Sequence, residues 1–357
     1  ERRERHEDRR GAEDHDHLGR HDAAVAVQQR AVARARATEP NSDLLGQALG
    51  LLAVIRIDQG RPAYAEAAFV QANEVLIKVH GHDSRVVALT LANAATAARQ
   101  QGKYQVSADR YAECLAILAR MGEPDPFLSA QTRQQRAIAL DYAGHREEAL
   151  AEARTAADWM KAKLPEADPR RMGAQVGYDW LVMRSGRTEE GARALAADAD
   201  PIIADVASRA LTPSQANVRR LKLNMDRVMI GLYEAGDMER GFRLAQLAME
   251  TEAGRAAAAL TERRAAGSES LADLLRQRQD LGAAREKANA AYLASVGGDA
   301  AKTAQLTEAL KARDGEVAAM DARLERDFPN YRVLAAPQTL TLAEAQASLD
   351  RFCETIA

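Results

Sequence analysis

The chain has 357 residues, which suits about two domains or one elongated array, and its net charge of -3 gives no strong electrostatic case for binding nucleic acid. Alanine is the commonest residue and only 4% of residues are aromatic, so closely packed helices are favoured over sheets. Two cysteines, Cys114 and Cys353, cannot form a disulfide framework, and no apolar run is long enough for a transmembrane helix.

Residues 1–18 are charged and carry almost no apolar side chains, so a helix there would have no face to bury. We predict that they are disordered or foreign to the fold. Histidines and aspartates at positions 14–22 are possible metal ligands, but a metal site needs rigid placement, so a solvated terminus is favoured and no metal is predicted. The chain starts at Glu1 without a hydrophobic signal region, so we expect a fragment or a processed form, located in the cytoplasm.

Glycines recur along residues 19–266 at an interval of about 42 residues. Each one separates two helix-like segments, and a turn between antiparallel helices favours a residue that tolerates a positive φ. The predicted turn glycines are Gly19, Gly60, Gly102, Gly144, Gly186 and Gly236. Their spacing predicts consecutive pairs of antiparallel helices over this region.

Small residues recur at two fixed offsets from these glycines. Five residues after each glycine stand Ala24, Ala65, Ser107, Ala149, Gly191 and Gly241, and twelve residues after it stand Ala31, Ala72, Cys114, Ala156 and Ala248. The two offsets are seven residues apart, so both positions lie on one helix face, where a small side chain lets a neighbouring helix come close. Cys114 is therefore explained by packing, and Asp198 is the exception at the second offset.

The glycine turns and the small residues resemble the tetratricopeptide repeat, a family that stacks helix pairs into a superhelix. The longer period of about 42 residues is similar to the repeats of kinesin light chains and many bacterial signalling proteins. The resemblance weakens around Gly186, where Asp179 and Asp198 occupy small positions, and around Gly236, where Met229 does so. It implies an all-α fold, a right-handed superhelical solenoid.

Residues 267–328 show a different helical pattern. Apolar residues follow a spacing of three and four in two runs, the first run is interrupted by Arg278 and Arg285, and Gly297 and Gly298 separate the runs. Two heptad-like helices joined by a glycine turn predict a long antiparallel helical hairpin. We expect the hairpin to lie against the end of the repeat array and to cover its last apolar face.

Residues 329–357 are interpreted as a connector and the start of a further region. A capping box formed by Thr341 and Glu344 predicts a helix that begins near Leu342. The order of repeats, hairpin, Phe-Pro-x-Tyr segment and Leu-Thr-Leu-Ala-Glu-Ala-Gln helix start resembles bacterial CHAT proteins. In that family the segment leads to a C-terminal caspase-like protease domain. We expect that domain to be absent, so its catalytic residues cannot be assigned and the chain is not predicted to be an enzyme.

The resemblance to tetratricopeptide repeats also implies a groove, lined by the first helix of each pair, in which peptides bind. Asn93, Gln135 and Arg227 lie nine residues before their glycines, where family members often place an asparagine that grips a peptide. Arg99 and Arg136 are expected to flank the same surface. The alternative is that all five are ordinary exposed residues, because repeat helices need polar outer faces in any case.

We interpret the chain as a non-catalytic protein- or peptide-binding scaffold or sensor that regulates a C-terminal CHAT protease in the intact protein. The alternative is a stand-alone adaptor that assembles a protein complex without a protease partner. The predicted partners are a protein or peptide in the groove and the CHAT domain, with no nucleic acid, membrane, cofactor or metal. An enzyme would require a cluster of perturbed ionisable groups or a nucleophile, and no base is recognisable beside Cys114.

Overall fold

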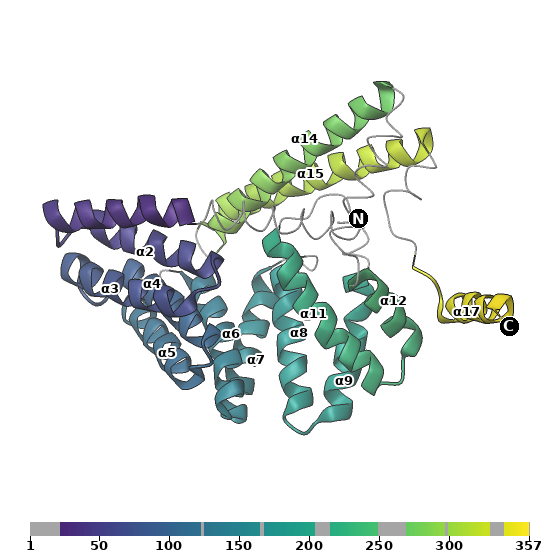
Figure 1. The fold of residues 1–357 in the computed structure, drawn as a ribbon, viewed down its shortest axis with the longest axis horizontal. Helices are drawn as coiled ribbons and strands as arrows, with labels where there is room; N and C mark the ends of the chain where they lie inside the picture. Colours follow the sequence, from purple (N-terminus) through teal and green to yellow (C-terminus); the bar gives the residue numbers. More distant parts are fainter. Residues whose placement is uncertain are drawn as a thin grey trace. The chain divides into compact units, whose positions relative to one another are not determined.

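The computed structural model describes residues 22–122, 125–164, 168–203, 215–248, 269–296, 299–328 and 339–356. In these ranges the chain forms helices and turns without a strand, and within each of its two units many helices pack against a neighbour in the sequence (Figure 1). The prediction of an all-α array of helix pairs followed by a helical hairpin is confirmed. The chain divides into two compact units, Glu1–Trp159 and Met160–Ala357.

None of the helices in the described ranges combines the length and the apolar character that a membrane span requires.

The first unit is a row of helices that pack in chain order. It contains an unlabelled helix over residues 22–38, then α2 (Asp43–Asp58), α3 (Pro62–His80), α4 (Arg85–Gln100), α5 (Tyr104–Arg120), α6 (Pro126–Ala143) and most of α7 (Arg146–Lys163). Contacts join α2 to α3, α3 to α4, α4 to α5 and α5 to α6, and α4 also touches α6. Because each helix contacts mainly its neighbours in the sequence, the unit has the nearest-neighbour packing of a repeat protein.

The turns inside the helix pairs depend on glycine. The predicted turn glycines that lie in the described residues all have a positive φ, from 67° at Gly60 to 96° at Gly186, a region that L side chains rarely adopt. Gly19 lies outside the described residues. Gly81 and Gly122, which do not follow the 42-residue spacing, also have a φ of 79° and end α3 and α5. Glycine therefore shapes both kinds of connection, within a pair and between pairs.

Side-chain caps fix where several first helices begin. The Ser42 hydroxyl accepts a hydrogen bond from the backbone N–H of Leu45 at 3.3 Å. The Asp125 carboxylate does the same for Leu128 at 2.9 Å, and Asp168 caps α8 in the second unit. Each cap satisfies a backbone donor that the first turn of a helix leaves without a partner.

Small side chains form the contacts between helices, as the repeat spacing predicts for a closely packed array. Ala65, Ser107 and Ala149 are fully buried, and so are Ala72, Cys114 and Ala156. At Gly191, a Cβ atom added to the backbone would lie 2.4 Å from the backbone nitrogen of Met183. Larger residues at these positions would force the helices apart.

The second unit continues the helix pairs and then changes character. It contains α8 (Pro169–Arg184), α9 (Thr188–Ala197), α11 (Gln215–Glu234), α12 (Met238–Ala248), α14 (Glu269–Ser295), α15 (Ala300–Asp327) and α17 (Leu342–Ile356). α11 packs against α8, α9 and α12, and their core includes Val176, Leu195, Ile202, Val228, Leu232 and Leu244. α14 and α15 pack against each other as the predicted hairpin, with Leu271, Leu274 and Leu324 in its core.

α12 is contacted by the segment around the start of α17. In the described residues, contacts join α12 to α17. The Gln246 side chain donates to the Leu340 carbonyl at 2.8 Å and accepts from its N–H at 2.9 Å. The hairpin meets α8, where the Arg170 guanidinium lies 5.9 Å from the centre of the Tyr292 ring.

Candidate functional site

Two of the predicted site residues meet on neighbouring first helices. Arg99, near the end of α4, donates from Nη2 to Oε1 of Gln135 on α6 at 3.2 Å. Asn93 lies on α4 with its side chain exposed. The structure thus brings Arg99 and Gln135 together and places Asn93 on one of the same two helices.

The guanidinium of Arg99 has an unused donor. Its Nε is buried and has no hydrogen-bond partner among the described residues. The neighbouring Tyr111 is buried on α5, and its hydroxyl bonds to Thr96 at 2.7 Å. Burial raises the pKa of Tyr111, and the hydrogen bond with Thr96 and the charge of Arg99 oppose that rise. Arg99 is therefore held at the edge of the packed interior, between Tyr111 and Gln135.

Arg136 is bound to the second helix of its own pair. Its Nη1 donates to Oε1 of Glu152 on α7, and its Nη2 lies 3.5 Å from Glu148. Arg133 donates to the other oxygen of Glu152 at 2.9 Å. Arg136 therefore takes part in an ion-pair cluster between α6 and α7.

Arg227 lies in the second unit, on α11. Its guanidinium carbon is 6.0 Å from the centre of the Trp180 ring on α8, and that of Arg184 is at the same distance from this ring. Attraction between a guanidinium group and an aromatic face helps to keep both arginines positioned. The predicted residue is thus part of an arginine–tryptophan cluster.

Exposed apolar residues on the first helices were missed by sequence reasoning. Leu51 is 52% exposed and Val54 45% exposed on α2, and Leu89 is 38% exposed on α4. Leu51 stands nine residues before Gly60, the same register position as Asn93. The repeat register is the signal that identifies Leu51, because the same position carries Asn93 one repeat later.

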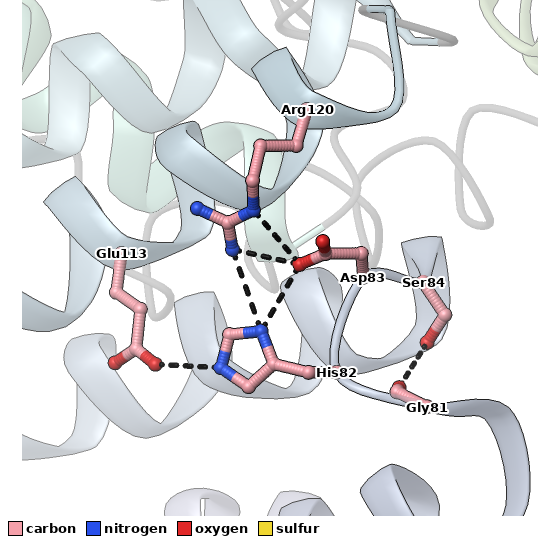
Figure 2. Close-up of polar contacts among 6 residues, drawn as sticks. All are labelled: Gly81, His82, Asp83, Ser84, Glu113 and Arg120. Atoms are coloured by element: carbon pink, nitrogen blue, oxygen red, sulfur yellow. Dashed lines mark hydrogen bonds and ion pairs between the residues drawn. The ribbon is translucent and has the colours of Figure 1, made fainter.

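A polar cluster joins the loop before α4 to α5 (Figure 2). The His82 ring lies 3.1 Å from the Asp83 carboxylate through Nδ1 and 3.3 Å from Glu113 through Nε2. Arg120 donates to Asp83 from Nε at 2.9 Å and from Nη2 at 2.7 Å. The hydrogen bond from Arg120, followed by that from His82, lowers the pKa of Asp83 to about 2, and the two carboxylates raise the pKa of His82. The charges in this exposed cluster are paired with one another, which gives it a connecting role between successive helix pairs.

No group of three or more potential metal-binding side chains is found in the ranges that the structure describes.

Cys114 is a packed thiol. It is fully buried on α5, and its Sγ lies 3.9 Å from the Thr132 hydroxyl. Burial raises the pKa of the Cys114 thiol to about 11, so the nucleophilic thiolate is suppressed near neutral pH. These surroundings agree with its place at a small packing position.

Two carboxylates occupy packing positions in α8 and just after α9. Asp179 is 5% exposed and accepts a hydrogen bond from Gln175 at 2.9 Å. The Oδ2 atom of Asp198 is buried and has no hydrogen-bond partner in the described part of the chain. Burial, and then the charge of Asp179, raises the pKa of Asp198 to about 7. The departure from the repeat pattern at these positions therefore creates an ionisable group within the packed helices.

Comparisons with known proteins agree with this architecture. Residues 47–120 match the family model described as tetratricopeptide repeat. No curated protein matches the chain. One similar solved structure is the crystal structure of the nearly identical TPR-like repeats of a putative kinesin light chain from Podosopora anserina. Its sequence is 17% identical to this one, the match covers 53% of this chain and 90% of that chain, and the TM-score is 0.47. The crystal structure of BtubC (BKLC) from P. vanneervenii is 15% identical, covers 64% of this chain and 89% of that one, and has a TM-score of 0.51.

Residues 47–120 therefore match tetratricopeptide repeats, and the solved structure with a TM-score of 0.51 shares the fold of this chain. Stacked helix pairs of this kind present an extended surface of the type that repeat proteins use for protein–protein interaction.

Proposed function

We propose that the chain is a scaffold that binds a protein or peptide through a face on α4 and α6. The observation that carries this proposal is the hydrogen bond between Arg99 and Gln135, which holds two groups suited to peptide recognition on neighbouring helices. The exposed Asn93 adds an amide that can both donate to and accept from a peptide backbone.

The chemistry of this face suits an extended peptide. The guanidinium of Arg99, held by its hydrogen bond to Gln135, is a group suited to a carbonyl or carboxylate of the ligand. The exposed Leu89 offers an apolar contact on α4, and Leu51 offers one on α2. Arg136 and Arg227 are proposed to serve the same role at their own positions, the first through the α6–α7 ion-pair cluster and the second beside Trp180.

Replacing Asn93 and Gln135 together with alanine tests the peptide-binding face. A pull-down from cells of the source organism, with the bound proteins identified by mass spectrometry, should recover at least five-fold less partner with the double variant. Glu74→Ala, an exposed change on α3, is the control and should recover the same amount as the original chain. Equal recovery with the double variant and an unchanged thermal transition would contradict the assignment.

For the intact protein, the proposed role is regulation of a C-terminal CHAT protease. Its support is the sequence resemblance of the connector, together with the contact between α12 and α17. The backbone N–H of Leu342 lies 3.2 Å from Glu239, and Leu340 pairs with Gln246. These bonds give the last repeat helices a physical connection to the segment that would precede the protease.

The alternative proposal is an adaptor without a protease partner. The coding sequence that follows Ala357 in the parent gene separates the two proposals. A caspase-like domain with a histidine and a cysteine in catalytic positions would support the regulatory role, and any other domain or a stop codon would support the adaptor.

A further inference from the structure

A cleft of about 360 Å³ lies between helix 22–38, α2 and α3 in the first unit. Its apolar lining includes Val32, Leu49, Leu52 and Ala68, with Tyr64 at the rim, 63% exposed. A volume of this size suits one or two side chains of a ligand. The residues that line it belong to a different set from Asn93, Arg99 and Gln135 on α4 and α6.

The polar side chains of the cleft are basic or neutral. Arg36 donates to Gln71 at 2.9 Å, and both line the cleft. Arg56 donates to Gln59 at 2.9 Å, and its guanidinium carbon lies 5.3 Å from the centre of the Tyr64 ring. None of the residues that line the cleft is acidic, and neither arginine pairs with a carboxylate in the described part of the chain. The cleft therefore presents two positive charges beside an apolar surface.

The next helix pair shows why this cleft is open. The residue 42 positions after Ala68 is Arg110, which extends across the corresponding space. Arg110 donates to Oε1 of Glu66 on α3 at 2.6 Å and to the Ala94 carbonyl on α4 at 3.3 Å. A further 42 positions on, Glu152 binds arginines of α6. Side chains that form ion pairs, Arg110 and Glu152, therefore stand at this position in the two following helix pairs, whereas Ala68 leaves the space unfilled.

We propose that this cleft binds an acidic peptide segment of a partner protein. One large apolar side chain of the peptide occupies the surface formed by Val32, Leu49 and Leu52, where burying it is favourable. Carboxylates on either side of that residue pair with Arg36 and Arg56, which have guanidinium donors to offer. Charge complementarity selects an acidic partner, and Gln71 can bind the peptide backbone at the rim.

The test measures binding of a fluorescein-labelled Glu-Asp-Leu-Phe-Asp-Glu peptide to the full chain by fluorescence anisotropy. The double change Arg36→Glu with Arg56→Glu should weaken binding at least ten-fold, because it reverses both charges. Ala68→Arg should cause a similar loss by filling the cleft as Arg110 fills the next one. Circular dichroism melts establish that each variant is folded, and the double change, which breaks no ion pair described in the structure, carries the test if Ala68→Arg unfolds the chain.

Matched controls keep the charge changes but avoid the cleft. Arg30→Glu with Arg34→Glu lies on the same helix, and Ala63→Arg lies on α3, and all three positions are exposed. Each control should change the affinity by less than about two-fold. A peptide with serine in place of Leu-Phe should bind at least ten-fold more weakly than the original.

Several outcomes would overturn the inference. Equal binding of the serine peptide would show that the apolar surface is not used. If Asn93→Ala with Gln135→Ala weakened peptide binding, the peptide would be assigned to the face on α4 and α6. That result would contradict binding in the cleft but not the proposed function. A dimer by light scattering that Arg36→Glu with Arg56→Glu converts to a monomer would assign the cleft to a second copy of the chain.

Discussion

Arg278 on α14 donates a hydrogen bond from Nε to Oδ1 of Asp321 on α15 at 2.6 Å, although the arginine side chain is only 5% exposed. Arg285 makes a similar bond to Asp314, also at 2.6 Å. The two arginines that interrupt the apolar pattern of the hairpin are thus its cross-links. Asp321 and Asp314 come in the reverse order along α15, as the antiparallel packing of the two helices requires.

Asp321→Ala should destabilise the hairpin by roughly 1 to 3 kcal/mol, because it leaves the buried guanidinium of Arg278 without its partner. Arg278→Leu should cost less, since it removes the buried charge and leaves Asp321 partly solvated. Urea unfolding followed by circular dichroism measures both. The control is Asp314→Ala, whose partner Arg285 is more exposed, and an equal loss from both aspartate changes would contradict the argument.

The second unit should become less stable as the pH rises through about 7. Folding raises the pKa of Asp198 from 3.8 to about 7, so the folded state binds the proton more tightly than the unfolded state. The stabilisation is complete below pH 3.8 and is lost as the carboxylate ionises near neutrality.

Asp198→Ala should therefore stabilise the chain by roughly 1 to 2 kcal/mol at pH 8 and by less at pH 5, because alanine removes a buried group without a partner. Denaturant unfolding at the two pH values measures the difference. Asp200→Ala, at a side chain 75% exposed, is the control and should show no such dependence on pH. A stability gain from Asp198→Ala that is the same at both pH values would refute the role of ionisation.

Glu66→Gln should destabilise the first unit by about 1 to 3 kcal/mol at pH 7. Burial on its own would raise the pKa of Glu66, but hydrogen bonds from Lys103, Arg110 and Gln101 lower it to about 2. The stabilisation is present above the ordinary value of 4.5 and is lost as the pH falls towards 2.

The difference between the original chain and Glu66→Gln should accordingly shrink between pH 5 and pH 3, as measured by urea unfolding. Glu74→Gln on the same helix is the matched control and should be close to neutral. A constant difference over this range would argue against ionised Glu66 as the source of the effect.

Cys114 should be inert to thiol reagents in the folded protein, because it is fully buried and its pKa is raised to about 11. In a chain with Cys353→Ser, a colorimetric disulfide reagent at pH 8 should detect no thiol until denaturant is added. Rapid reaction of one thiol before unfolding would show that the site opens readily.

The repeat spacing predicts the helix pairs because close packing leaves a strong imprint on the sequence, as the buried Ala65, Ser107 and Ala149 illustrate. The same register located Gln135, which bonds to Arg99. Both the small packing residues and the position of Gln135 recur at a fixed interval, so the same pattern can be recognised at several places in one chain.

Features that occur in a single pair escape this kind of reasoning. The cleft beside Ala68 depends on volume that Arg110 occupies one repeat later, and an absent side chain leaves no pattern. Arg278 reads as an interruption because its partner Asp321 is distant in the sequence. Asp198 is recognisable as a departure from the small-residue pattern, but its raised pKa depends on burial that only the fold reveals.

The left-handed backbone at Gly60, Gly102 and Gly144 has an evolutionary consequence. Because the same glycine turn recurs every 42 residues, an in-frame duplication or deletion of that length begins and ends at equivalent turns. Genes of this design can gain or lose a whole helix pair in one event and still encode turns that fold.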